Sequence, residues 1–538
     1  MDRTRIIFIA IIGLALMAVC GVVAYNLITP DESLVDGTAV ADATPGSSSS
    51  SSTPTVRLDS PEPIWGPNND AHSDLPAYIC GADAFGSYFT LQQMQMSGTD
   101  IENGFRLGII PFDLNDDYAI SEEQRTALLD SGQWNCLLTT LDSVALSSPG
   151  VITAIVDESA GADQLWGRDV PTINDLKGQR ITFSRGSVGE YFVYYALSIA
   201  QLSPRSDVTL VPQDSVADAV AAFNEGQADV VSGWEPDIYD AESSGGAPLL
   251  SSNQLRIVID VIVTSRQSLN SNAELVQNFH NAWFATLKAQ TEGFDTAASQ
   301  IAAWGNNDWS YVYEESASDD FRLWLESVAQ ADLGDNAFVM RDTRPIINRL
   351  QIARRVWAAS DLSVPADDVT ALVEPSYVLR AADQASLQPL ANPVNDTFSI
   401  SAQLDLTDVA TGDAATLAVL PCRTFVFLPE STELTLESRR ILDNCVVPTL
   451  SQSVGLFLRV KGSSAWPAND PPWTEDDILE VAEGRAQSVV DYLVSQGIDP
   501  ARFIVEAELP PVEHRNTDDA NIQESDRFVE LTLVTSGR

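Results

Sequence analysis

The chain has few basic residues for its length of 538 residues. Its lysines are Lys177, Lys288 and Lys461. Its 30 lysines and arginines stand against 76 acidic residues, which gives a formal net charge of −46. Binding to DNA or RNA needs clustered Lys and Arg that neutralise phosphates. The composition therefore excludes a nucleic acid as partner, and it disfavours a broad electrostatic contact with anionic lipid.

Histidine is equally scarce, and this bears on catalysis and metal binding. None of His72, His280 and His514 belongs to an H-E-x-x-H motif or pairs with a cysteine motif. Zinc sites need Cys and His at fixed spacings, and neither a P-loop nor a G-x-S-x-G motif occurs. We therefore expect no catalytic residue, no metal and no cofactor, and we predict that the protein is not an enzyme.

One long apolar run lies near the N-terminus. Ile6–Ile28 is apolar except for Asn26 and follows Arg3 and Arg5. A run of about 20 residues can span a bilayer, and it is longer than the apolar part of a usual signal peptide, about 7–15 residues. Basic residues before the run place that side in the cytoplasm. We expect residues 1–33 to be a single-pass inner-membrane anchor, with the bulk of the chain in the periplasm or outside the cell; a cleaved signal is the alternative.

Length alone suggests about three domains, and two polar stretches divide the chain accordingly. Residues 34–76 contain the run GSSSSSSTPT and further prolines, a composition that cannot bury a core, so they are predicted to be a disordered linker. Residues 381–420 are polar with little periodicity and are predicted to be a second connector. Two folded parts then remain, 77–380 and 421–538.

The first folded part alternates short apolar strands with amphipathic helices. Strands are expected at 181–183, 208–211 and 229–232, with helices at 190–200 and 215–224 between them. This alternation predicts an α/β fold with parallel strands. Ligands of such sheets bind beyond the carboxyl ends of the strands.

Two further apolar runs are expected to cross between two lobes. GVITAIVD, at 150–157, leads toward a second lobe at about 160–262, and RIVIDVIVT, at 256–264, returns from it. Two crossings of this kind make a hinge, which we place near Asp157 and Asp260.

Several sequence motifs of the second lobe occur in a characteristic order. Residues 171–239 contain D-L-K-G-x-R-I, then G-S, then A-A-F-N-x-G-Q-A-D-V-V, then W-E-P. This order resembles the solute-binding proteins of ABC importers, of the sulfonate/nitrate/thiamine-precursor type, which have the type II periplasmic-binding-protein fold. The resemblance extends over about 77–379. It implies a two-lobed domain that closes on a small polar solute and delivers it to an ABC permease.

The resemblance and the strand ends together give a candidate ligand site between the lobes. Asp142 and Glu235 favour a cationic group on the ligand, whereas Arg185 and the helix N-terminus after Gly186 favour an anionic one; a zwitterion satisfies both. Aromatic walls are expected from Phe85, Tyr88 and Trp134. The expected ligand-binding residues are Ser87, Thr139, Thr140, Asp142, Gly186, Ser187, Trp234 and Glu235.

The last 118 or so residues carry a second resemblance. The segments F-V-F-L-P-E-S-T-E-L-T-L-E-S-R-R-I-L, G-R-A-Q-S-V-V-D-Y-L and S-D-R-F-V-E-L-T-L, with a strand between the first two, resemble the α+β OmpA-like domain shared with MotB. The resemblance implies attachment to peptidoglycan through Arg485 and Arg527, because a guanidinium holds a carboxylate in a bidentate fork. The family's aspartate is replaced here by Ala465.

Four cysteines lie outside the apolar N-terminal run. An oxidising compartment permits disulfides, and four cysteines allow three pairings. The domain boundaries favour Cys80–Cys136 and Cys422–Cys445, each within one folded part.

Two functions are therefore expected from the sequence. The first is a membrane-anchored binding protein that captures a small solute, with its C-terminal domain on the cell wall. The alternative is a cell-envelope scaffold or tether, in which the two-lobed part docks a protein partner or senses a ligand.

Overall fold

The structure is a computed structural model that describes residues 58–112, 114–304, 307–387, 415–452, 456–468 and 472–535. The chain divides into two units, Met1–Val56 and Arg57–Arg538, and the fold described here belongs to the second. The expected membrane anchor and most of both expected linkers lie outside the described residues. Within the described residues, the search for a helix of the length and hydropathy that a bilayer span requires gave no candidate.

A seven-stranded sheet forms the first lobe, with the order β1-β3-β2-β4-β11-β5-β12. β2 pairs in parallel with β3 and β4, whereas β11 pairs antiparallel with both β4 and β5. Its strands are β1 (Ile64–Trp65), β2 (Ala77–Ala82), β3 (Arg106–Pro111), β4 (Cys136–Thr140), β5 (Val151–Ser159), β11 (Ile259–Thr264) and β12 (Val328–Gln330).

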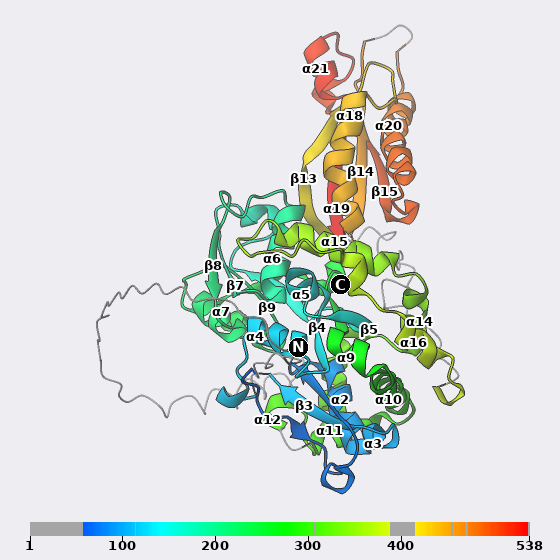
Figure 1. The fold of residues 1–538 in the computed structure, drawn as a ribbon. Coiled ribbons are helices and arrows are strands. Elements are labelled where there is room, and N and C mark those ends of the chain that lie inside the picture. Colours follow the sequence, from blue (N-terminus) through cyan, green and yellow to red (C-terminus); the bar gives the residue numbers. More distant parts are fainter. Residues whose placement is uncertain are drawn as a thin grey trace, which may run out of the picture. The chain divides into compact units, whose positions relative to one another are not determined.

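The second lobe has a five-stranded sheet with the order β10-β6-β9-β7-β8. Its strands are β6 (Asp163–Gly167), β7 (Arg180–Ser184), β8 (Thr209–Gln213), β9 (Val230–Trp234) and β10 (Ala247–Ser251). Helices α6 (Val188–Ile199) and α7 (Val216–Asn224) lie beside β7 and β9 (Figure 1). The alternation expected from the sequence is confirmed, and β6 and β10 are added at one side of it.

The chain passes between the two sheets twice, as expected. β5 ends at Ser159 in the first sheet and β6 begins at Asp163 in the second. β10 ends at Ser251, and β11 returns to the first sheet from Ile259. The hinge predicted near Asp157 and Asp260 therefore lies where both crossings leave the first sheet.

Helices pack around the first sheet. A helical turn, η2, follows β2, and α15 contacts both α5 of the first lobe and α6 of the second. The helices used below are η2 (Gly86–Phe89), α5 (Leu141–Ser147), α10 (Ala273–Glu292), α13 (Ala317–Glu326), α15 (Arg344–Trp357) and α16 (Ser376–Ala382).

The first lobe begins earlier than the sequence suggested. β1 pairs with β3, and the indole Nε1 of Trp134 donates to the Ser60 hydroxyl at 3.0 Å. The part of the expected linker from Leu58 onward is therefore an edge of the first lobe, a contribution that its proline-rich composition conceals.

The C-terminal part is an α+β domain with a four-stranded sheet of order β13-β16-β14-β15. β14 and β15 pair in parallel, and the other neighbours pair antiparallel. The long helix α20 lies along β14 and β15 (Figure 1). Its elements are β13 (Ala415–Val426), α18 (Leu436–Ile441), α19 (Val447–Gln452), β14 (Phe457–Ser463), α20 (Glu475–Ser495), β15 (Phe503–Glu508) and β16 (Phe528–Thr535). β13 starts inside the expected connector, so this domain also begins before its expected boundary at 421.

Two disulfides join the cysteines as the domain boundaries suggested. Cys80 of β2 is bonded to Cys136 of β4, and Cys422 of β13 is bonded to Cys445. Each bond closes a loop within one folded part, which restricts the unfolded chain.

Candidate functional site

Four carboxyl groups are buried where the chain crosses between the lobes. Asp157 of β5 lies opposite Asp260 of β11 in the strand register. Asp163 begins β6, and Asp142 lies in the first turn of α5. All four are at most 5% exposed. We call Asp142, Asp157, Asp163 and Asp260 the hinge carboxyls.

The hinge carboxyls have few neutralising partners. The hydroxyl of Tyr88, on η2, donates a hydrogen bond to Asp260. The adjacent Glu158 is paired with Arg256, with 3.5 Å between nitrogen and oxygen. Among the described residues, no lysine or arginine forms an ion pair with a hinge carboxyl. Within the described residues, no basic side chain is therefore paired with a hinge carboxyl to stabilise its ionised form.

Burial and mutual proximity shift the acidity of these groups. Burial raises the pKa of the Asp142 carboxyl to about 7; the nearby Thr140 hydroxyl offsets part of the rise, and Asp163 adds to it. Burial likewise raises the pKa of Asp163 to about 7. Burial raises the pKa of Asp260 and of Asp157, and Asp157 raises that of Asp260 further. The low dielectric favours the neutral acids, so ionising them costs free energy.

Three of the expected ligand residues in the first lobe lie beside this cluster. Thr140 caps α5, with its hydroxyl 2.9 Å from that of Ser143, and Asp142 follows in the same turn. Ser87 is fully buried on η2 and close enough to Asp157 to lower its pKa. Thr139 pairs with Val261 and is half-buried at the end of β4.

The expected ligand residues of the second lobe are engaged within their own lobe. The backbone N–H of Gly186 donates to the carboxylate of Glu190 at 2.7 Å. The Ser187 hydroxyl caps α6 by accepting from Gly189 and donates to Ser184. Two N–H groups at the turn that suggested an anion site are thus bonded within the chain, that of Gly186 to Glu190 and that of Gly189 to Ser187.

Two further expected ligand residues, Trp234 and Glu235, lie at the end of strand β9 in the second lobe. Trp234 is the last residue of β9 and pairs with Asp163 of β6. Glu235 follows it and accepts a hydrogen bond from the Tyr239 hydroxyl. Arg185, the expected anion partner, forms an ion pair with Asp361 at 3.0 Å on the surface.

An aromatic group borders the hinge carboxyls on the first-lobe side. The Phe85 and Tyr88 rings pack edge to face, with 5.4 Å between their centroids. Phe85 also packs edge to face with Trp324 of α13, with 6.5 Å between the centroids. Trp134, expected as a third wall, is instead buried in the first lobe and stacks on Phe112 at 5.5 Å.

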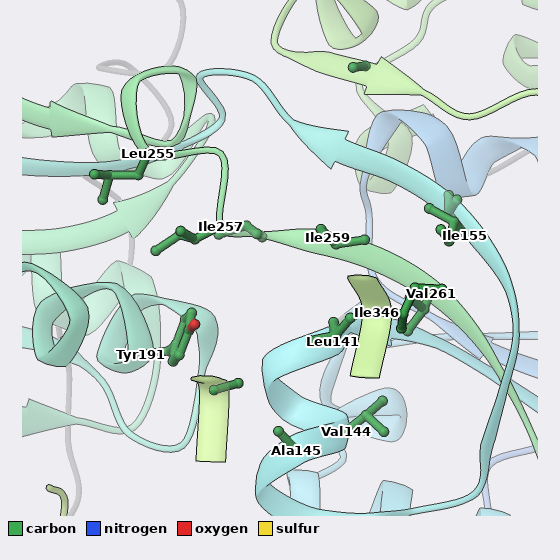
Figure 2. Close-up of a cluster of buried hydrophobic side chains, with 14 of the residues drawn as sticks. Leu141, Val144, Ala145, Ile155, Tyr191, Leu255, Ile257, Ile259, Val261 and Ile346 are labelled. Atoms are coloured by element: carbon green, nitrogen blue, oxygen red, sulfur yellow. The ribbon is translucent and has the colours of Figure 1, made fainter. Parts of the chain in front are cut away.

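Buried apolar side chains from both lobes and from the returning crossing form one cluster near the hinge (Figure 2). The residues labelled in the cluster are Leu141, Val144, Ala145, Ile155, Tyr191, Leu255, Ile257, Ile259, Val261 and Ile346.

A separate cavity lies at the other end of β5. It has a volume of about 760 Å³ and is lined by Val151, Glu274, Glu374, Tyr377 and Arg380, among others. None of the expected ligand residues lines it. It therefore contributes nothing to the site between the lobes.

Metal ligation finds no support in the described part of the chain. No group of three or more His, Cys, Asp or Glu residues has the arrangement of a metal site there. Burial lowers the pKa of His280 to about 4, and its Nδ1 lies 2.8 Å from the Val276 carbonyl of the same helix, so it is a core residue.

The C-terminal domain contains a second charged site, around Arg485 of α20. Arg485 is fully buried, and its guanidinium donates to the carbonyl oxygens of Ser463 (2.9 Å), Ser431 (3.0 Å) and Leu428 (3.3 Å). Burial, together with the neighbouring Arg527, lowers its pKa to about 10. No described carboxylate forms an ion pair with either arginine, although the chain is strongly acidic.

We expect Arg485→Lys to destabilise the C-terminal domain by about 2 kcal/mol. A lysine cannot donate to three diverging carbonyls, and each buried carbonyl left without a donor costs about 1–3 kcal/mol. Calorimetry of the full chain measures the shift of the corresponding transition. The exposed Arg440 gives a matched control, Arg440→Lys, and an equal shift in the two variants contradicts the prediction.

The sequence analysis missed part of the site between the lobes. Asp157 and Asp260 were expected only as hinge positions, and Asp163 was not singled out. The signal was an acid within an otherwise apolar strand, in GVITAIVDES and in RIVIDVIVT. A buried acid in such a run is either paired or functional.

Comparisons with known proteins give one family match. Residues 152–292 match the model of a family described as NMT1/THI5 like. No curated protein sequence gives a significant match. The matched stretch contains both strand crossings, the whole second lobe and α10. It supports the interpretation of this part of the chain as a solute-binding domain.

Solved structures are also similar to the chain. One is the alkanesulfonate-binding protein SsuA from Xanthomonas axonopodis pv. citri bound to MOPS, at 17% identity over 56% of this chain and 98% of that chain, with a TM-score of 0.42. Another is the periplasmic aliphatic sulphonate binding protein SsuA from Escherichia coli, at 15% identity over 56% and 92%, with a TM-score of 0.43. A third is the desulfurization enzyme DSZB, at 16% identity over 57% and 98%, with a TM-score of 0.36. At these scores, ligand and activity have to be argued from this chain's own geometry.

Proposed function

We propose that the two-lobed part is a solute-binding protein that presents a small polar solute to an ABC-type importer outside the cytoplasm. The observation that carries this proposal is the buried polar cluster at the two strand crossings. Buried polar groups that lack partners cost free energy, and their position at a hinge lets a ligand engage them on closure. The role is non-enzymatic, in line with the scarcity of histidine and metal-ligand groups.

Binding is tested by native mass spectrometry of the purified full chain, followed by isothermal titration. We expect a co-purified small molecule, or a saturable heat with one of the panel of sulfonates, amino acids, amines and pyrimidines. If no member of the panel binds and no adduct is seen, the solute-binding role fails. The enzyme alternative is checked on the same samples, because a bound compound that changes mass on incubation contradicts a purely binding role.

The finer parts of the proposal concern attachment to the envelope. The apolar run Ile6–Ile28 serves as the membrane anchor, and the C-terminal domain is an OmpA-like domain that attaches to peptidoglycan. What supports the attachment is the pair of neighbouring arginines, Arg485 and Arg527, which have no carboxylate partner among the described residues. A peptide-stem carboxylate could pair with Arg527 directly, whereas at Arg485 it has to displace one of the three backbone carbonyls.

Attachment is tested by sedimentation with purified peptidoglycan. We expect the parent chain to sediment with the wall and Arg527→Ala to sediment several-fold less. Arg527 is half-buried and makes one side-chain hydrogen bond, to the Phe427 carbonyl, so its guanidinium is able to pair with a carboxylate of the wall. Arg440→Ala, on the same domain's surface, is the control. If the parent stays in the supernatant, the tether role is excluded, and solute binding is unaffected.

A further inference from the structure

The hinge carboxyls bear on the charge of the solute, which the proposed function leaves open. They come from four elements, α5, β5, β6 and β11, which belong to both lobes. Three of the carboxyls have their pKa raised by another: Asp163 acts on Asp142, Asp157 acts on Asp163, and Asp157 and Asp163 act on Asp260. The fourth, Asp157, lies opposite Asp260, which lowers its pKa. Four acids from distant parts of the chain therefore share one buried site.

Unsatisfied polar atoms point to a ligand at this site. Among the described residues, no hydrogen bond of ordinary geometry reaches a carboxylate oxygen of Asp142 or Asp157. Thr140 and Ser87 nevertheless lie close enough to lower the pKa values of Asp142 and Asp157, respectively. The Ser87 hydroxyl, fully buried and beside Asp157, makes no hydrogen bond of ordinary geometry either. Buried polar side chains are usually hydrogen-bonded, and each exception needs an explanation. Several exceptions gathered around one hinge are explained by a ligand that donates hydrogen bonds.

The arginines closest in sequence to the site and to the expected anion contact already have acidic partners. Arg256 is paired with Glu158, and Arg185 is paired with Asp361. Beside the N-terminus of α6, the Gly186 N–H is bonded to the Glu190 carboxylate. An anion entering the site would lie next to four acids without a basic partner, and an unpaired charge in a low dielectric is strongly disfavoured. A cation would stabilise the ionised form of these acids.

Aromatic rings favour an organic cation over an inorganic one. Tyr88 joins the two features, because its ring packs against Phe85 while its hydroxyl donates to Asp260. Phe85 in turn meets Trp324, and both are half-buried. Aromatic faces attract ammonium groups by cation–π interaction. No metal-ligand arrangement was found among the described residues.

We propose that the solute held between the lobes carries a cationic nitrogen, an organic ammonium group, which the hinge carboxyls receive while Phe85, Tyr88 and Trp324 contact its carbon skeleton. This inference rests on the proposed solute-binding function and specifies its substrate class. It also separates this chain from the sulfonate-binding proteins to which its fold is similar.

The test compares matched probes by isothermal titration of the full chain. The probes are ethanolamine, choline, the neutral carbon isostere of choline (3,3-dimethylbutan-1-ol) and ethanesulfonate. We expect an ammonium probe to bind at least 10-fold more tightly than the neutral isostere, and ethanesulfonate not to bind. Asp157→Asn, which keeps the shape and removes the charge, should weaken the ammonium probe at least 10-fold, whereas the exposed Asp214→Asn should leave it unchanged.

The outcomes distinguish the ammonium inference from the proposed solute-binding function. Tighter binding of ethanesulfonate or of the neutral isostere, or a co-purified ligand without a basic nitrogen, overturns the ammonium inference and still supports solute binding. Unchanged ammonium binding in both Asp157→Asn and Ser87→Ala also overturns it, because the site is then elsewhere. Absence of any small-molecule binding overturns the proposed function and the inference together.

Discussion

The ligand-free protein is expected to be less stable at pH 8 than at pH 5, by about 3 kcal/mol for the unit that contains the two lobes. The cause is the burial of Asp142 and Asp163, which raises their pKa values to about 7 from the ordinary value of 3.8. Between pH 4 and pH 7 the folded state binds more protons than the unfolded state, so stability falls as the pH rises. The loss of folding stability is complete above pH 7 and absent below pH 4.

The size of the effect follows from the two shifts. One pKa unit corresponds to about 1.4 kcal/mol, so a shift of about three units in one carboxyl amounts to roughly 4 kcal/mol. The carboxyls interact, so their effects do not add in full. The groups that face Asp163 and Asp142 are Asp157, Thr140, Ser159 and Glu122. None of them carries positive charge.

Calorimetry of the full chain at pH 5, 6, 7 and 8 measures this dependence. Repulsion between the ionised surface acids also lowers stability as the pH rises, since the net charge is −46. A control variant is therefore essential. Asp163→Asn should flatten the pH profile and stabilise the protein at pH 8, whereas Asp214→Asn removes an exposed charge and should keep the slope. Equal slopes in the two variants contradict the assignment to the buried carboxyls. A bound ammonium ligand should also flatten the profile, because it stabilises the ionised acids.

Much of the fold could be predicted from local pattern. The strands and helices from β7 to β9 lie within a few residues of their expected bounds, because each carries enough apolar periodicity of its own. β1 and β12 have two and three residues, which is too short for any period. They exist because the neighbouring strand offers free backbone groups at its edge.

The site was predictable only in part, for a related reason. The Tyr88–Asp260 hydrogen bond joins residues 172 positions apart, and the pairing of Asp157 with Asp260 depends on the order of the strands in the sheet. No local spacing encodes either contact. By contrast, the hydrogen bond from the Gly186 N–H to Glu190 joins residues four positions apart, so local sequence could have suggested it. The expectation of an anion site did not take Glu190 into account.

The C-terminal domain should unfold on replacement of Gly462 by alanine. Gly462 lies on β14 against α20, and a Cβ built there would lie 1.9 Å from the backbone oxygen of Ala482 and 2.8 Å from its carbonyl carbon. Backbone atoms cannot rotate away as a side chain can, so the helix has to move off the sheet. Overpacking a core usually costs about 1–3 kcal/mol, and a clash with helix backbone should cost more than about 4 kcal/mol.

A second glycine of the same domain supplies the control for this prediction. Gly484 lies within α20, and its Cβ would meet only the Thr432 side chain, at 3.0 Å. Alanine favours a helix over glycine by about 1 kcal/mol, so Gly484→Ala should be neutral or stabilising. Limited proteolysis of the full chain distinguishes the variants, because only Gly462→Ala should lose the C-terminal domain while the two-lobed part persists. If both variants resist protease equally, β14 and α20 are not packed at the distance described, and the hydrogen bond from Arg485 of α20 to the Ser463 carbonyl of β14 is wrong with it.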